Sequence, residues 1–194
     1  MGLADVQTAL AKLFTDEDLR NRFFDDPLSV GRSLGLDDSE AAGLTGLSEL
    51  HVTQFARSLR RKRVDDARKV LPLTSRALGD SFAPLLLGVL DGPLPRDRHR
   101  DDARMLAMNL ERLARNGTLD PPWAADLARF ELTFTEIRKQ RSVIIARRFR
   151  FPVGLLADAI NRGEPIPQAR PGCTVGLWLR IPGRRGVIHR VLFS

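Results

Sequence analysis

Histidine, cysteine and carboxylate side chains perform most acid–base chemistry and metal binding in proteins, and this chain spaces them in no catalytic pattern. Its three histidines, His51, His99 and His189, lie far apart and form no H-x-x-x-H or H-x-x-E-H pair. The single cysteine, Cys173, excludes both an intramolecular disulfide and a paired-cysteine zinc site. No glycine-rich phosphate loop or nucleophile elbow is present. We therefore expect a chain that is not an enzyme, binds no metal and needs no cofactor.

Adjacent acidic pairs invite a metal-binding interpretation, but helix capping explains the best placed of them. Asp26 directly precedes a proline, and Asp37 lies three residues before a glutamate, as in a capping box. A carboxylate at a helix start accepts backbone hydrogen bonds and complements the helix dipole. Asp126 and Glu131 lie inside a later predicted helix. Whether they are solvated or face a partner stays open.

Positive charge is concentrated at the C-terminal end of the chain. Residues 138–194 contain twelve Lys and Arg residues and two acidic residues, whereas residues 1–137 carry a net charge of −3. Such a segment is suited to an anionic surface, which can belong to nucleic acid, an acidic peptide or an acidic protein. An open edge of a small sheet can also accept an added peptide strand. The candidate peptide-binding residues are Arg147, Arg148, Arg150, Arg184, Arg185 and Arg190.

Two alternatives to peptide binding remain at this point. The C-terminal arginines can simply keep an exposed sheet soluble. A second basic run, residues 57–63, can form a phosphate-contacting stripe of a DNA-binding, transcription-related protein. Asp65 and Asp66 follow this run and partly cancel its charge. Charge reversal at Arg148 and Arg150 should weaken partner binding if the sheet is the binding element.

The elements that carry these residues change in type along the chain. Apolar residues recur with a helical period through the first 137 residues, and we expect Thr15 and Asp80 to cap helices there. We expect Asp120 and Pro121 to open a further amphipathic helix. After Gln140 the period becomes two, which predicts a strand over 143–151, a short helix over 152–161 and a β-hairpin around residues 182–186.

The predicted fold class is therefore α+β: a mostly helical N-terminal body and a small C-terminal antiparallel β-sheet containing a hairpin. We expect three domains, namely helical residues 1–63, helical residues 64–140 and a small basic β-rich domain, 141–194. No apolar run reaches the roughly 18–20 residues of a membrane span, and no signal peptide is evident. These features predict a cytoplasmic protein without a membrane partner.

Two segments of this chain resemble a known family. The stretch RKVLPLTSRALGDSFAPLL from Arg68 and the stretch PPWAADLARFELTFTEIR from Pro121 resemble the helical domain of partner proteins of multinuclear non-haem iron-dependent oxidative enzymes. That domain has also been labelled as DNA-binding. The tail from Phe149 looks like the C-terminal domain of actinobacterial members. The resemblance covers about residues 68–194, and residues 1–60 lie outside it.

The resemblance implies a specific role. Such partners carry no iron, dock on a barrel-shaped iron enzyme and present a ribosomally made precursor peptide whose side chain is oxidatively rearranged. The leader part of the peptide is commonly held by strand addition. It also implies a hetero-oligomer with the iron enzyme and a leader peptide as ligand. The arginines of the sheet, rather than the resemblance, lead us to expect that this leader is acidic.

Overall fold

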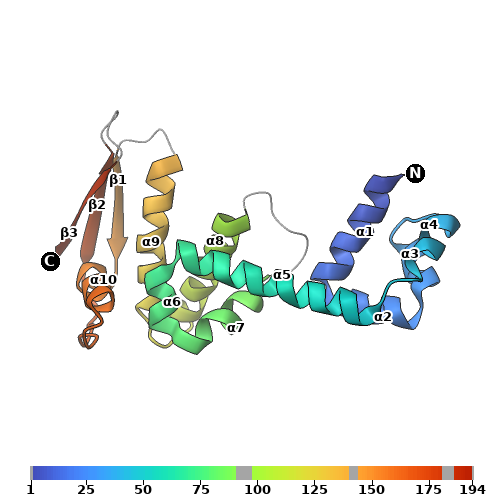
Figure 1. The fold of residues 1–194 in the computed structure, drawn as a ribbon. Helices are drawn as coiled ribbons and strands as arrows, with labels where there is room; N and C mark the ends of the chain where they lie inside the picture. The colour runs from blue at the N-terminus through green and yellow to red at the C-terminus, as the bar shows by residue number, and fades with distance from the viewer. Residues whose placement is uncertain (1, 91–97, 140–143, 181–185, 194) are drawn as a thin grey trace. The chain divides into compact units, whose positions relative to one another are not determined.

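The computed structural model describes residues 2–90, 98–139, 144–180 and 186–193. A helical chain is followed by a three-stranded antiparallel sheet in the order β1-β2-β3, into which one further helix is inserted (Figure 1). The α+β class predicted from the change of hydrophobic period is confirmed. None of the described helices is long and apolar enough to cross a membrane.

The helices occupy most of the chain before the sheet. Their bounds are α1 Leu3–Thr15, α2 Glu17–Asp25, α3 Pro27–Ser33, α4 Asp38–Leu44, α5 Glu49–Val70, α6 Pro72–Leu78, the 3₁₀ turn η1 Gly79–Ser81, α7 Phe82–Leu87, α8 Arg98–Arg115 and α9 Ala124–Lys139. The C-terminal elements are β1 Ile144–Phe149, α10 Val153–Arg162, β2 Thr174–Arg180 and β3 Val187–Phe193.

The chain divides into two compact units, and the division falls inside α5. The first comprises Met1–Val64 with Leu90–Arg98, and the second comprises Asp65–Val89 with His99–Ser194. In the first unit, short helices α1–α4 enclose a small core that includes Leu13 and Phe23. In the second unit, helical and sheet residues share one core, in which Leu127 of α9 packs with Trp178 of β2.

The sheet of the second unit packs its inner face against α9 and α10. β2 is the central strand, with Ala146 of β1 and Arg190 of β3 both opposite Leu177. Phe149, Trp178 and the partly buried Val191 point inward, into the core. Trp178 is fully buried and its ring lies over Gly176, where an added Cβ would be 2.5 Å from the indole. The glycine therefore makes room for the largest core side chain.

Local capping signals were partly right. Asp26 accepts a hydrogen bond from Ser29 N at 3.1 Å, and Asp37 forms the predicted capping box of α4. Thr15 does not cap α2. That role belongs to Asp16, which accepts from Leu19 N at 2.8 Å, while the Thr15 hydroxyl donates back to its own helix.

Two other helix starts differ from expectation. Asp80 lies inside η1 and makes no side-chain cap, because the chain turns there through a 3₁₀ segment. The helix expected to open at Pro121 begins at Ala124 instead. Helix α10, predicted over 152–161, spans Val153–Arg162 and is followed by Gly163, whose φ of +67° is the left-handed geometry that glycine favours.

Candidate functional site

The C-terminal arginines lie in different environments. Arg147 lies on the inner side of β1 and forms an ion pair with Glu136 of α9 at 2.7 Å. The Arg150 guanidinium stacks over the Phe151 ring, 5.8 Å from its centroid. These contacts tie the sheet to its own unit. Arg184 and Arg185 lie outside the described residues.

Arg148 and Arg190 are the two candidate arginines that face away from the helices. Both are exposed, and neither has an ion pair within the described part of the chain. They lie on opposite edge strands, Arg148 on β1 and Arg190 on β3, and Leu177 separates Arg190 from β1. Their charges are therefore available to an incoming group.

The outer face of the sheet that carries these arginines is otherwise apolar. Ile188 and Leu192 of β3 remain 51% and 61% exposed, and Ile144 of β1 is 61% exposed. Val175 and Leu177 of β2 lie between them and are also exposed. Soluble chains rarely gather exposed aliphatic side chains on one sheet face unless something binds there. As far as the structure describes it, this outer face is an apolar surface that carries two arginines.

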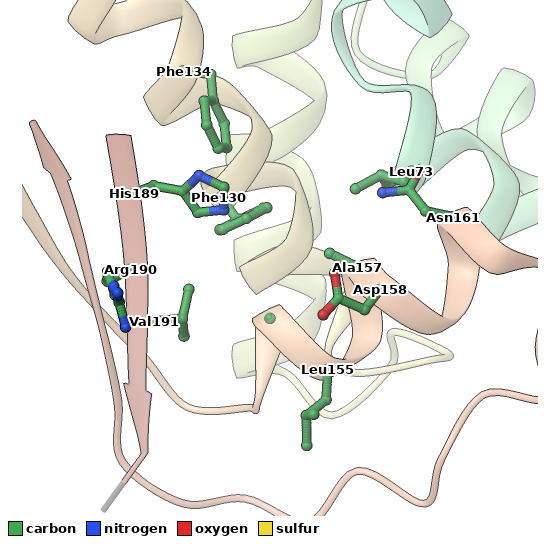
Figure 2. Close-up of a pocket in the computed structure, with 11 residues that line it drawn as sticks. Leu73, Phe130, Phe134, Leu155, Ala157, Asp158, Asn161, His189, Arg190 and Val191 are labelled. Carbon is green, nitrogen blue, oxygen red and sulfur yellow. The ribbon is translucent and has the colours of Figure 1, made fainter. Parts of the chain in front are cut away.

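A pocket of about 450 Å³ opens beside β3, on the inner side of the sheet. Phe130 and Phe134 of α9 form one wall, and the His189 ring packs edge-on against Phe134 with centroids 5.0 Å apart (Figure 2). Asp158 of α10 lies across the pocket from these rings, with its carboxylate turned inward (Figure 2). Leu73 and Asn161 complete this part of the lining.

The pocket exists because α10 approaches β3 closely at only one end. An added Cβ on Gly154 would lie 3.3 Å from the Val191 side chain, so the helix start touches the strand there. Further along α10, the gap between helix and strand is lined by Ala157 and Asp158. Within the described residues no strand pairs with the outer edge of β3. An open strand edge and a pocket thus lie side by side.

The two α9 carboxylates left open by sequence analysis are buried and hold backbone in place. Glu131 accepts hydrogen bonds from Leu73 N at 2.7 Å, from Thr74 N at 2.9 Å and from the Thr74 hydroxyl at 2.6 Å. Glu131 therefore caps α6 from another helix. The Leu-Pro-Leu-Thr turn and the helix segment ending at Glu131, both part of the family resemblance, are joined by this cap.

Asp126 plays the same part at the end of β1. It accepts from Arg150 N at 2.6 Å and from Phe151 N at 3.0 Å, which fixes the turn into α10. Burial raises the pKa of both Asp126 and Glu131. The backbone and Thr74 hydrogen bonds act in the opposite direction and offset part of each rise.

A second pocket, of about 280 Å³, lies where α8, the start of α9 and the turn between β1 and α10 meet. Arg129 dominates it and is held by Glu111 at 3.2 Å and Asp126 at 3.4 Å. Its guanidinium also stacks over Phe149. These internal contacts account for the charged side chains of this pocket, because Glu111 and Asp126 already neutralise Arg129.

The basic run 57–63 lies on α5 and is not one continuous exposed stripe. Arg60 forms an ion pair with Glu17 at 2.8 Å, and Arg63 is buried. Arg57 and Arg61 remain exposed. One turn later, Asp65 forms an ion pair with Arg68 at 3.3 Å. These contacts do not favour a phosphate-contacting surface.

Within the described ranges, no three His, Cys, Asp or Glu side chains gather as a metal site would require. Comparison with known proteins adds no assignment: no protein-family model, curated protein or solved structure matches the chain.

Sequence reasoning missed the two features that define the site. The outer apolar face was missed because both alternating sets of β2 are apolar, Trp178 on one side and Val175 with Leu177 on the other. Thr174 and Gly176 lie on the same side of β2 as Trp178. These small residues beside a tryptophan were the signal that this side faces the core. The pocket depends on Gly154 and α10, whose approach to β3 no local pattern reports.

Proposed function

We propose that this chain is a non-catalytic accessory subunit that binds a precursor peptide and presents it to a multinuclear non-haem iron enzyme. The peptide adds as a strand to the free edge of β3. The other protein performs the oxidation.

The observation that supports this proposal best is the edge of β3 itself. Its exposed side chains include Ile188 and Leu192, and its neighbours include a pocket suited to a side chain. Unprotected apolar edges are aggregation hazards, and proteins usually blunt them with charge, proline or a cover. In β3, only Arg190 interrupts the exposed apolar residues of the outer side. A peptide strand would cover this edge and satisfy its backbone groups.

The identity of the enzyme partner comes from the family resemblance. The segments that carry it, from Arg68 and from Pro121, form the α6–α7 region and α9. Of these elements, α9 and Leu73 of α6 line the pocket, so both segments of the resemblance contribute to the proposed peptide site. We place this work in the cytoplasm, where a lone Cys173 would remain reduced.

The DNA-binding alternative lacks a supporting observation of its own, since Arg60 and Arg63 are engaged within the fold. It remains a distinct outcome of the experiments described below.

Hydrogen exchange and reconstitution together test the proposal. Adding the precursor peptide to the full chain should slow amide exchange in β3 more than in α1–α4. The iron enzyme should modify the peptide faster when the chain is present, and the chain alone should leave the peptide unchanged. Turnover by the isolated chain, or no protection of the sheet by any peptide, would refute the proposed function.

A further inference from the structure

We infer that β3 selects the sequence of the peptide that it binds. Three outward-facing side chains of β3 and the pocket on its inner side determine the selection. The preferred peptide has an acidic residue opposite Arg190 with apolar residues two positions to either side. A neighbouring residue of the peptide, next to His189 or Val191, points inward and carries a large side chain that ends in a hydrogen-bond donor. This inference rests on the proposed function, because it specifies the peptide for the same strand edge.

The outward preference follows from the alternation of β3. Side chains directly opposite each other on neighbouring strands lie about 4.5–5.5 Å apart at Cβ and interact as pairs. The outward residues of β3 are Ile188, Arg190 and Leu192, all exposed. A residue opposite Arg190 meets a guanidinium with no ion pair among the described residues, which favours a carboxylate. Residues opposite Ile188 and Leu192 meet aliphatic surface.

The inward preference follows from the pocket. Residues of the added strand next to His189 and Val191 point toward the helices, into the 450 Å³ space. That volume is within the roughly 300–1,000 Å³ of pockets that enclose small ligands, so a large side chain fits. The near wall consists of the Phe130, Phe134 and His189 rings. The far side offers the Asp158 carboxylate, for which the described residues supply one ion pair, a long 3.9 Å contact with Arg162.

Such a pocket suits a tyrosine, lysine or arginine. The stem of each can pack on the aromatic wall while its terminal O–H or N–H donates to Asp158. A purely aliphatic side chain would fill the space but leave the Asp158 carboxylate, whose side chain is 65% exposed, to water and to its long contact with Arg162. A terminal hydrogen-bond donor therefore distinguishes the residues that the pocket prefers from the aliphatic residues that it only tolerates.

A second copy of this chain is a poorer occupant of the same edge. In an antiparallel β3–β3 pair, matching Ile188 of one copy with Leu192 of the other places the two Arg190 residues directly opposite each other. Like charges in that position are destabilising. The edge thus selects a strand of different sequence, with a carboxylate where this chain has Arg190.

A displayed library of random short peptides, selected on the purified full-length protein, tests the inference without knowledge of the natural ligand. Selected peptides should share the apolar–acidic–apolar alternation and an inward Tyr, Lys or Arg. The best of them, labelled and titrated, should bind Arg190→Glu several-fold to about thirtyfold more weakly, as loss of an attractive cross-strand pair and gain of a repulsive one imply. A second selection on Arg190→Glu should return Lys or Arg in place of the acid.

Three further variants make the result decisive. Arg170→Glu, an exposed loop substitution of equal charge, should bind within about twofold of the wild type, since surface charge alone has a small effect. Asp158→Asn should relax the inward preference and keep the outward one. Arg148→Glu tests the opposite edge of the sheet, at β1, and should lower peptide affinity less than Arg190→Glu does.

The outcomes separate this inference from the proposed function. Peptides that bind but lose more affinity with Arg148→Glu than with Arg190→Glu would place the added strand on β1, which refutes the inference and keeps strand addition. Binders without a common acid, or an unchanged profile on Arg190→Glu, also refute it. Failure to select any peptide refutes the proposed function. A stable dimer formed through β3 refutes both.

Discussion

Glu131 is a buried carboxylate that accepts three hydrogen bonds from two residues of α6. Burial raises its pKa above the ordinary value of 4.5, and the hydrogen bonds from Thr74 and Leu73 offset part of the rise. When protonated, the acid can donate to the Thr74 hydroxyl and still accept from both backbone N–H groups. An amide cannot, because its NH₂ group has no free lone pair. Glutamine is therefore no substitute for the neutral acid here.

Glu131→Gln should lower the free energy of unfolding by about 1–3 kcal/mol, the cost of leaving a buried donor unsatisfied. Urea denaturation at neutral pH measures the change. Glu164→Gln, at an exposed side chain, is the control and should stay within about 0.5 kcal/mol of wild type. Equal stability of the two variants would mean that the cap contributes nothing.

The raised pKa of Glu131 also gives a pH dependence of definite sign. Between pH 4.5 and the raised value, the folded chain holds a proton that the unfolded chain has lost. The contribution of Glu131 to the free energy of unfolding therefore falls as pH rises through that window and is constant above it. The stability difference between wild type and Glu131→Gln should shrink across the window in urea titrations. A difference that grows with pH would show that the pKa is lowered instead.

Gly176 is the residue on which the position of Trp178 depends. A Cβ at this position would lie 2.5 Å from the indole ring, and the ring is enclosed by Phe130, Phe134 and Phe149. Gly176→Ala should therefore cost about 1–3 kcal/mol, as overpacking of a filled core does. Gly172→Ala is the matched control, because nothing lies within 4 Å of its added Cβ. Denaturation midpoints with unchanged m-values measure both, and equal midpoints would contradict this packing.

At the scale of elements, the sheet has two apolar faces of which only one is covered, and a matched pair of substitutions distinguishes them. Val191 points toward Gly154 of α10, whereas Val175 lies on the outer face and is 40% exposed. Val191→Thr should cost about 1–3 kcal/mol, because it places a hydroxyl against the core. Val175→Thr changes the same atoms in contact with water and should cost less than about 0.5 kcal/mol. Thermal denaturation compares them, and a reversed order would show that the outer face is the buried one.

The order and type of elements followed from sequence because each depends on neighbours close in the chain. The capping box at Asp37 and the left-handed Gly163 were predictable for that reason. Asp16 displaced Thr15 as a cap because an aspartate one residue later offers a stronger acceptor to Leu19 N. This error displaced the cap by a single residue, and the helix that it begins was correctly expected.

The site was less predictable, because its parts meet only in the folded chain. The roles of Glu131 and Asp126 depend on partners 57 and 24 residues away, at Thr74 and Arg150. Counting arginines identified Arg190 but could not separate it from Arg147, which α9 neutralises through Glu136. Composition locates charge along the sequence, and packing decides which charges remain available.

At the scale of the whole molecule, the net charge of +7 will attract any polyanion at low salt. Weak duplex DNA binding at low ionic strength would therefore not distinguish a DNA-binding protein from a peptide-binding one. The salt dependence does, because a protein that contacts several phosphates releases several counterions, with a log–log slope of about −0.9 per phosphate.

A peptide held mainly by backbone hydrogen bonds, apolar contacts and one pair at Arg190 should instead show a shallow slope, close to that of a single charge pair. Anisotropy titrations of a selected acidic peptide and of duplex DNA across a range of salt concentrations give both slopes. Charge reversal at Arg57 and Arg61, two exposed arginines of the basic run on α5, should weaken duplex binding and leave peptide affinity within about twofold. Arg190→Glu should weaken peptide binding and leave duplex affinity nearly unchanged. A peptide slope as steep as that of DNA, or sensitivity of the peptide to the α5 arginines, would mean that diffuse charge rather than the β3 edge holds the ligand.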